Sequence, residues 1–220
     1  MRQKSAILQR KLNEMINKIH NQKNKTKKRL TNGNFYGQIF GDEDSIDWEG
    51  IGVIEFDNGG KYEGEILNGV KHGIGILSGD FGIIMGEYEN DYINGFGIQE
   101  HQTNGRYEGT WENNKLSGFG IRTFKCNHLY IGGIFEANIS GEGKYVYDNG
   151  DYYIGEFREG KRVKGKVYYK NEKGVFDSVW SYDKEKDETI AKGIFYLPDG
   201  TKEKRTRIID SVKGIWEYDD

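Results

Sequence analysis

The first chemistry that the sequence suggests is dinucleotide binding, through the glycine-rich stretch GKYEGEILNGVKHGIGIL at residues 60–77. Gly73-x-Gly75 resembles the start of the glycine fingerprint that holds a pyrophosphate. A tandem repeat explains the same glycines, because related stretches return four times further along the chain. The runs GIGILSG (73–79) and GFGIRT (118–123) both belong to that repeat. We therefore interpret these glycines as structural and expect no dinucleotide site.

Metal and nucleophile chemistry would depend on His and Cys, of which the chain has four and one. They fall at different repeat positions and form no CxxC or HxxxH spacing. These residues are His20, His72, His101, His128 and Cys126. No P-loop is present, and acidic pairs such as Glu63 and Glu65 lie two apart on one strand, as solvated surface carboxylates usually do. The sequence therefore predicts no enzyme, no metal and no cofactor, and the single cysteine fits a reducing compartment.

A tandem array with a spacing of 22 or 23 residues must position these side chains. Each unit opens with aromatic-x-Gly-x-apolar and reaches Gly-x-Gly eleven residues later, although the last unit keeps only Gly165. The five units begin at Tyr62, Ile84, Tyr107, Tyr130 and Tyr153. Weaker copies begin at Phe35, with DEDS (42–45) inserted, and at Phe176, with DKEKDE (183–188) inserted. Extra residues at the two ends alone are typical of a stacked array, whose internal units must match both neighbours.

Within a unit, two short alternating segments such as 62–66 and 73–77 flank a turn at LNGVKH, which predicts a β-hairpin. Tandem hairpins predict an all-β fold: an elongated, single-layer antiparallel sheet. One glycine per unit recurs on the same strand face, where the missing side chain lets a neighbouring ring lie over the backbone. These repeat glycines are Gly64, Gly86, Gly109, Gly132 and Gly155.

YEGTWENNKLSGFG (107–120) and YEGEILNGVKHGIG (62–75) closely match Y-x-G-x-W-x-x-G-x-x-x-G-x-G, so the array resembles MORN repeats. The resemblance covers roughly residues 35–200. Together with the segments on either side of the array, it divides the chain into four parts. They are a basic helix and linker at 1–30, a degenerate first unit at 31–61, five clear repeats at 62–175 and a degenerate last unit and cap at 176–220. About 30 residues precede the array and about 45 follow it, too few for the catalytic domains that some family members carry.

The charge of the chain is divided between a basic N-terminal arm and an acidic remainder. Residues 1–30 hold ten Lys or Arg and one Glu, a net +9, whereas the rest holds 22 basic and 34 acidic residues, a net −12. The apolar residues of 5–20 recur at helical spacing, so we expect an amphipathic helix N-capped by Ser5 and followed by a polar linker at 21–29. The apolar stripe is Ile7, Leu8, Leu12, Met15, Ile16 and Ile19, and the basic residues that would meet a partner are Arg10, Lys11, Lys18, Lys27, Lys28 and Arg29.

Three interpretations of this arm stay open. It could dock its apolar stripe on the sheet or on a partner, bind an acidic surface such as an anionic membrane, or serve as a cleaved presequence. Nucleic acid is disfavoured because no aromatic residues alternate with the basic ones. No apolar run approaches the roughly 20 residues of a membrane span.

Strand alternation predicts two surfaces on the array. One face should be a groove lined by an aromatic ladder over the repeat glycines: Tyr62, Tyr88, Tyr107, Trp111, Tyr130, Tyr153 and Phe157. The other face should carry an apolar assembly ladder: Ile74, Ile76, Phe96, Ile98, Phe119 and Ile121. A single layer cannot cover both faces, so either the N-terminal helix or a partner subunit should lie across the assembly ladder through its three repeats.

The resemblance implies a non-enzymatic scaffold for protein–protein assembly in a cytoskeletal or ciliary complex of the axonemal or radial-spoke type. Its partners would be protein subunits and its location cytoplasmic and cytoskeletal. The alternative is a tether that binds anionic phospholipid through the basic arm.

Overall fold

The computed structural model describes residues 1–22, 25–42, 44, 48–171, 173–183, 188–210 and 216–219. Most of the two inserted runs predicted at 42–45 and 183–188 lies outside these residues. The chain folds into two compact units, Met1–Arg122 (unit 1) and Thr123–Asp220 (unit 2).

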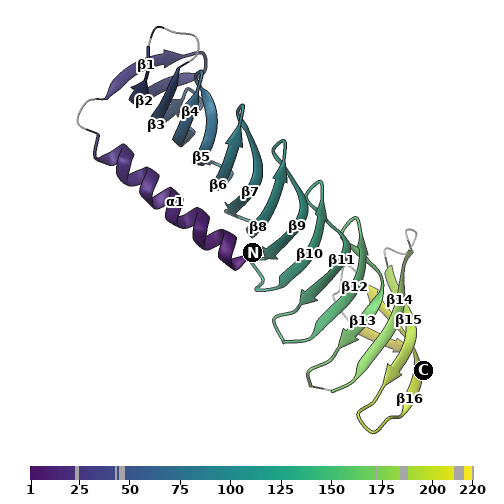
Figure 1. Ribbon diagram of the computed structural model, residues 1–220. Coiled ribbons are helices and arrows are strands. Elements are labelled where there is room, and N and C mark those ends of the chain that lie inside the picture. The colour runs from purple at the N-terminus through teal and green to yellow at the C-terminus, as the bar shows by residue number, and fades with distance from the viewer. Residues whose placement is uncertain are drawn as a thin grey trace. The chain divides into compact units, whose positions relative to one another are not determined.

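Unit 1 combines one helix with an antiparallel sheet in which each strand pairs with the next strand along the chain (Figure 1). Its elements are α1 (Arg2–His20), β1 (Thr26–Leu30), β2 (Gly33–Phe40), β3 (Glu49–Phe56), β4 (Lys61–Leu67), β5 (Val70–Gly79), β6 (Gly82–Glu89), β7 (Tyr92–His101), β8 (Gly105–Glu112) and β9 (Lys115–Thr123).

Unit 2 repeats the same hairpin arrangement. Its strands are β10 (Leu129–Phe135), β11 (Asn138–Val146), β12 (Tyr152–Arg158), β13 (Lys161–Tyr168), β14 (Val175–Asp183), β15 (Glu188–Tyr196), β16 (Lys202–Asp210) and β17 (Trp216–Asp219). The predicted all-β class, the tandem antiparallel hairpins and the N-terminal helix are thus confirmed.

Two-residue turns join the strands of each repeat hairpin. In the first repeat Asn68 and Gly69 have φ of 52° and 81°, and in the third Asn113 and Asn114 have φ of 48° and 65°. Two successive positive φ angles are typical of the type I′ turn, whose twist matches that of the flanking strands. The turn is therefore shorter than LNGVKH, because Val70–His72 already pair with β4.

The two glycines of each Gly-x-Gly pair have different structural roles. Gly75 pairs with Gly64 on β4 and with Gly86 on β6, so it belongs to a row of glycines that crosses the strands of unit 1. Gly73 instead has a φ of 59° and lies where the β4–β5 register shifts, which marks a bulge. The spacing that resembled a dinucleotide fingerprint is therefore one bulge glycine followed by one row glycine.

Tyrosine rings lie over the glycine row. A Cβ atom on Gly75 would lie 2.3 Å from Cζ of Tyr62, and one on Gly143 of unit 2 would lie 2.7 Å from Cζ of Tyr130. The Tyr62 hydroxyl donates to the carbonyl oxygen of Glu65 at 3.0 Å, beside the bulge, and so satisfies a backbone group there. The sequence-based expectation of rings lying over repeat glycines is confirmed for four of the five. The exception is Gly86, over which Ile93 lies because its repeat opens with Ile84 in place of tyrosine.

The N-terminal arm differs from its prediction at both ends. The helix begins at Arg2 rather than near residue 5, its N-cap is Met1 without a side-chain hydrogen bond, and Ser5 lies inside the helix, so the predicted Ser5 cap is wrong. The predicted linker is also wrong at Thr26–Arg29, because these residues pair with β2 as strand β1. Pairing with a partner strand overrides the polar, basic composition of this segment.

Candidate interaction surfaces

The face that carries the glycine row and the tyrosine rings, here the core face, is closed in both units. All seven members of the predicted aromatic ladder are buried, with Trp111 the most exposed at 6 %. Neighbouring rings pack edge to face: Tyr62 against Tyr88 and Tyr130 against Phe157, each with centroids 5.2 Å apart. The prediction that this ladder lines a groove is therefore wrong, because the buried rings pack against one another.

Burial also sets the chemistry of these rings. Loss of hydration raises the pKa of Tyr107 to about 12, and burial together with the charge of Glu142 raises that of Tyr130 to about 12. The hydroxyls therefore stay protonated at neutral pH and donate to backbone carbonyls, Tyr107 to Thr110 at 3.0 Å and Tyr130 to Gly133 at 2.9 Å. The core face is thus a structural layer.

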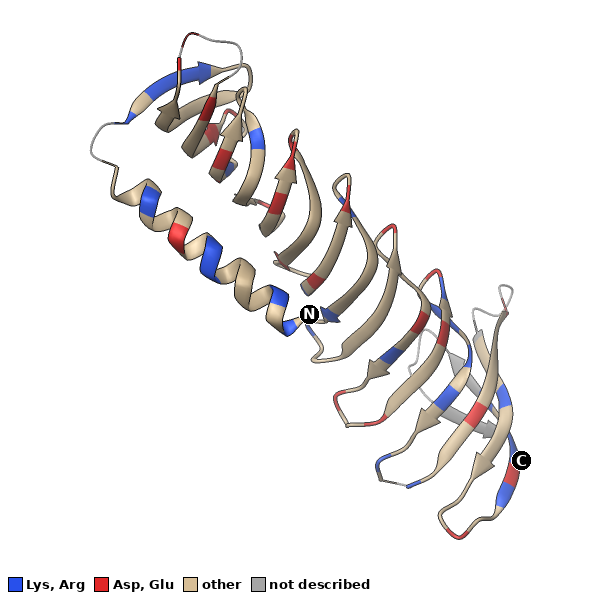
Figure 2. Cartoon of the chain, viewed as in Figure 1, with Lys and Arg blue, Asp and Glu red and all other residues tan. Residues whose placement is uncertain are grey.

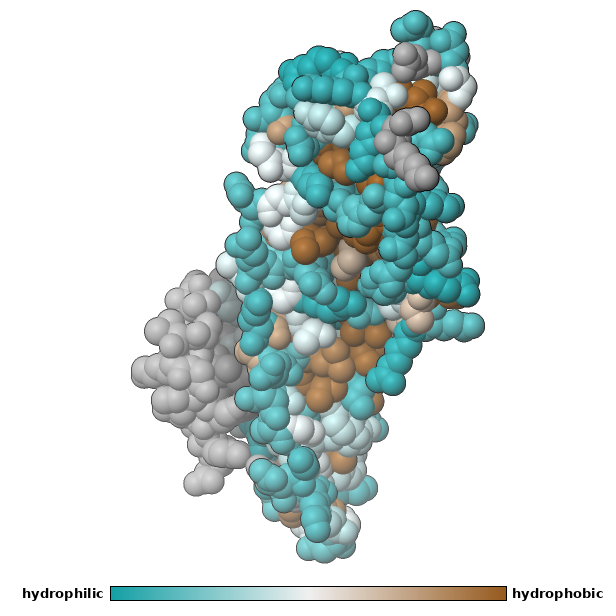
Figure 3. Space-filling model, turned by 90° about the vertical axis from the view of Figure 1, so that its left-hand side faces the viewer, coloured by the Kyte–Doolittle hydropathy of each residue, from teal (hydrophilic) through white to brown (hydrophobic). Residues whose placement is uncertain are grey.

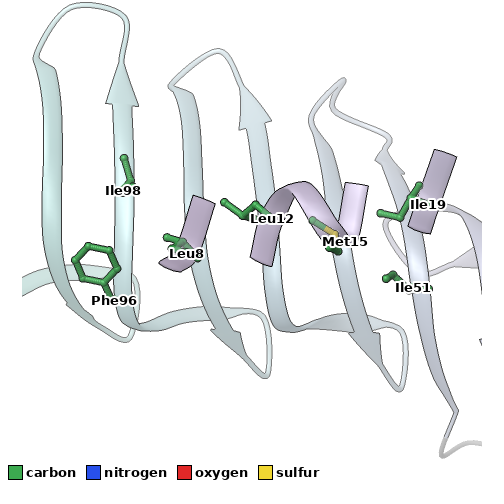
Figure 4. Close-up of a cluster of buried hydrophobic side chains, with 7 residues drawn as sticks. All are labelled: Leu8, Leu12, Met15, Ile19, Ile51, Phe96 and Ile98. Carbon is green, nitrogen blue, oxygen red and sulfur yellow. The ribbon is translucent and has the colours of Figure 1, made fainter. Parts of the chain in front are cut away.

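The opposite face of the sheet, here the second face, is covered in unit 1 by α1. Leu12 is 0 % exposed and forms one cluster with residues of β3 and β7 below it (Figure 4). The buried members of this cluster are Leu8, Leu12, Met15, Ile19, Ile51, Phe96 and Ile98, and Met1, Ile16, Val53, Ile74, Ile76 and Met85 pack around them. The open question of what covers the assembly ladder is thereby answered for these strands: the chain's own helix.

The coverage differs from the prediction in two places. Ile7 is 41 % exposed and is not part of the buried stripe, which runs through Leu8 instead. Phe119 on β9 is 52 % exposed, so the helix covers two of the three predicted repeats of the ladder and, in addition, Ile51 of the degenerate first unit. Phe96 and Ile98 are interior residues of unit 1 and are not available to a partner while α1 is docked.

Polar contacts hold α1 at both ends. Near its start, the Ser5 hydroxyl donates to Glu108 on β8, which also accepts from Nε of Arg106 at 2.9 Å. Beyond its end, Nε2 of Gln22 donates to the carbonyl oxygen of Ile51 at 3.1 Å. These contacts fix the register of the helix along the sheet, which apolar packing alone specifies weakly.

The Glu108 contact predicts a pH dependence of helix docking. Burial disfavours the carboxylate, but hydrogen bonds from Ser5 and Arg106 and the charges of Arg106 and the N-terminus outweigh it, so the pKa of Glu108 lies below its ordinary 4.5. A lowered pKa in the folded state stabilises docking above the ordinary pKa, and this contribution is lost as the pH falls through the folded value. The protection factors of the amides of residues 5–8, taken relative to the intrinsic exchange rate at each pH, should therefore fall in acid by an amount equal to about 1 kcal/mol. Glu108→Gln should show the faster exchange already at neutral pH, whereas an unchanged rate would contradict the role of this carboxylate.

The predicted basic arm is not one free segment. Lys27 lies over the Tyr36 ring at 5.4 Å, Lys28 over the Trp48 ring at 5.1 Å, and Arg29 pairs with Asp57 at 2.7 Å. Along α1 the basic residues Arg10, Lys11 and Lys18 are exposed, and Figure 2 shows blue bands on the helix beside red bands on the strands of unit 1. The arm therefore presents charge to solvent through α1, while the basic residues of β1 make contacts within unit 1.

A cavity of about 690 Å³ lies on the second face at the C-terminal end of α1. Lys18 and Gln22 line it from the helix side, and Phe40, Glu49 and His72 line it from the strands. Oε1 of Gln22 and Nδ1 of His72 are buried and have no hydrogen-bond partner among the described residues. The sequence analysis considered His72 only as a possible metal ligand. That His72 lies beside a cavity could not be predicted, because the cavity forms where the end of α1 lies over the strands.

Sequence reasoning missed two arginines on the core face of unit 2. Arg162 takes the place that Ile139 has in the preceding repeat, and its guanidinium lies 5.3 Å from the Tyr153 ring and 4.6 Å from the Trp180 ring. Burial lowers the pKa of Arg162 to about 10, which leaves it charged at neutral pH. Arg207, 2 % exposed, contacts aromatic rings in the same way. For Arg162 the available signal was an arginine at the repeat position that Ile93 and Ile139 hold in the second and fourth repeats.

The candidate catalytic residues are not brought together. His101 accepts a hydrogen bond from the backbone amide of Thr103 at 3.1 Å, Nδ1 of His128 lies 2.9 Å from the Tyr145 hydroxyl, and Cys126 is an exposed free thiol. Within the described ranges, no group of His, Cys, Asp or Glu is arranged to hold a metal ion. Among the described residues, no helix is both long enough and apolar enough to cross a membrane.

Apolar side chains also reach the surface outside the helix-covered cluster. Figure 3 shows them as separate brown patches between teal hydrophilic side chains on the face that it views. Besides Phe119, the large exposed apolar residues include Val179 at 63 % and Ile154 at 43 %, both on unit 2. Exposed groups of this kind mark candidate contact sites.

Five segments of the chain match the family model described as the MORN repeat. They are residues 62–80, 85–106, 107–125, 130–152 and 153–172. The hairpins on either side, with Phe35 and Phe176 in the ring position, fall outside these matches, although Gly37 pairs with Gly52 and Ser178 with Gly193 as the repeat requires. No curated protein matches the chain.

Proposed function

The chain belongs to the MORN-repeat family, since its matched repeats span residues 62–172, and from this premise we propose that it is a non-enzymatic scaffold for protein–protein assembly. MORN repeats commonly serve as scaffolds for interaction with proteins or lipids. The finer part of the proposal is that the partners are protein subunits of a cytoskeletal or ciliary complex and that the chain works in the cytoplasm.

The observation that carries the choice of protein over lipid is the folded state of the N-terminal arm. The apolar stripe that would insert into a bilayer is buried against unit 1, with Leu8, Leu12 and Ile19 no more than 4 % exposed. Membrane binding through an amphipathic helix depends on burying its apolar face in the lipid boundary. A docked α1 offers a membrane only its charged side, above an array that is net acidic.

Co-purification with the tagged full chain tests the scaffold role. We expect protein subunits in constant proportion to the chain, retained after detergent removes lipid. Recovery of lipid vesicles without a stoichiometric protein would contradict the proposal. Cross-linking of the purified complex would then locate the partner on unit 1 or unit 2.

A vesicle experiment tests the membrane alternative without disturbing the fold. Deleting residues 1–30 would uncover the apolar cluster and remove β1, so the better variant reverses three exposed charges on α1: Lys4→Glu, Lys11→Glu and Lys18→Glu. We expect little sedimentation of the wild-type chain with phosphatidylserine vesicles at physiological salt, and no change in the triple variant, because each exposed basic residue contributes only about 1 kcal/mol. Strong sedimentation that the triple variant abolishes would favour the tether.

A further inference from the structure

Unit 2 uses the same repeat positions as unit 1 for its second face, but there lysines outnumber carboxylates. In unit 1, the residues that flank the row glycines include four glutamates and no Lys or Arg: Glu63, Glu65, Glu87 and Glu108. In unit 2, four lysines take such positions: Lys144, Lys164, Lys166 and Lys192. Lys202 and Lys204 extend the basic face on β16, against three carboxylates at Glu142, Glu156 and Asp177. The second face is therefore acidic in unit 1 and basic in unit 2.

Apolar side chains lie among these lysines and are open to solvent. Val179 is 63 % exposed and pairs with Lys164 on one neighbouring strand and with Lys192 on the other. Ile194 is 38 % exposed and pairs with Lys204. Two of the lysines are partly neutralised, Lys164 by Glu156 at 3.7 Å and Lys166 by Asp177 at 3.5 Å. The face thus combines exposed branched apolar residues with an excess of positive charge.

Unit 1 shows what the second face of a MORN sheet can accommodate. An amphipathic helix lies across its strands, with Leu8, Leu12, Met15 and Ile19 buried and its basic residues directed outward. The helix is basic where the sheet below it is acidic, so packing and long-range charge act together. Ile154, Val179 and Ile194 of unit 2 are the counterparts of that packing surface, and no helix of the described part of unit 2 covers them.

We propose that the second face of unit 2 binds an acidic amphipathic α-helix of a partner protein. The partner helix places apolar residues at the spacing of Leu8, Leu12, Met15 and Ile19 over the exposed aliphatic residues, and its Asp and Glu flanks meet the lysines. The α1 helix of a second copy does not fit, because its basic flanks would face a basic surface. The proposal rests on the scaffold function and specifies the chemistry of one partner segment.

Two labelled peptides with the same apolar stripe test the proposal on the full chain. One has the sequence of residues 2–22, and the other carries Arg2→Glu, Lys4→Glu, Arg10→Glu, Lys11→Glu and Lys18→Glu. Fluorescence anisotropy should show that the charge-inverted peptide binds at least about tenfold more tightly. Val179→Asp should weaken this binding by about tenfold or more, whereas Phe119→Asp, with the same change in net charge at an exposed site of unit 1, should leave it unchanged.

Each other outcome counts against the proposal. Equal affinity for both peptides, no binding of the charge-inverted peptide, or equal effects of Val179→Asp and Phe119→Asp would overturn it. Sedimentation with phosphatidylserine vesicles that Val179→Asp abolishes would assign this face to a membrane instead. Protein partners that still co-purify with a chain that fails the peptide test would overturn this inference and leave the scaffold function standing.

Discussion

Leu12→Ala should release α1 from unit 1, with a loss of about 2–5 kcal/mol in the free energy of docking. Leu12 is 0 % exposed at the centre of the cluster formed with Ile51, Phe96 and Ile98, so the substitution leaves a cavity that the rigid strands cannot close. Amide hydrogen exchange measures the effect directly. Protection of the α1 amides should fall roughly 30-fold or more, while the strands of unit 2 keep theirs.

Ile7→Ala is the matched control on the same helix. Ile7 is 41 % exposed, so its truncation should change α1 protection by no more than about 0.5 kcal/mol. Release of α1 in the Leu12 variant should also expose Phe96 and Ile98 and make the chain bind apolar dyes. If Ile7→Ala and Leu12→Ala have the same effect, or neither changes protection, the helix does not dock through this face.

Gly75→Ala should lower the unfolding free energy of unit 1 by about 3 kcal/mol. The new Cβ would lie 2.3 Å from two atoms of the Tyr62 ring, which is 0 % exposed and held by its hydroxyl contact to Glu65. The ring has no free space to enter, so either the ring or the strand pairing must shift. Urea denaturation of the variant measures the loss.

Two further variants separate ring overlap from a general effect of alanine. Gly60→Ala should cost much less, because its nearest contact is the Asn58 side chain at 3.3 Å. Combining Gly75→Ala with Tyr62→Ala should cost less than the sum of the single variants, since the ring that the new Cβ meets is gone. Additive costs would mean that the glycine row is required for a reason other than the overlying ring.

The sheet was predictable because its determinants are local and repeated. Glycine is favoured by the positive φ at Gly69, by the bulge at Gly73 and by the ring that lies over Gly75. Because the repeat spacing is 22 to 23 residues, similar requirements recur along the sequence. Strand alternation then assigns Tyr62 to one face and Ile74 to the other without further information. The amphipathic stripe, predicted within residues 5–20, was readable for the same reason.

The ends of the arm were not predictable from local residue types. Serine is a common N-cap, but the Ser5 hydroxyl donates to Glu108, a residue 103 positions away, and the actual N-cap is Met1, four residues before Ser5. Thr26–Arg29 has the composition of a linker and becomes a strand because the edge of β2 offers backbone partners. Both errors arise where a distant partner overrides local preference.

By itself, the sequence determined the repeat, the hairpins, the two faces of the sheet and an amphipathic helix whose apolar stripe must pack against another surface. Only the tertiary structure decided that the aromatic face is closed, that α1 covers Ile51 and Phe96 while Phe119 stays open, and that exposed aliphatic residues of unit 2 lie beside lysines. The physical reason is that alternation along a strand fixes which side chains share a face. What covers that face depends on side chains and segments far away in the chain.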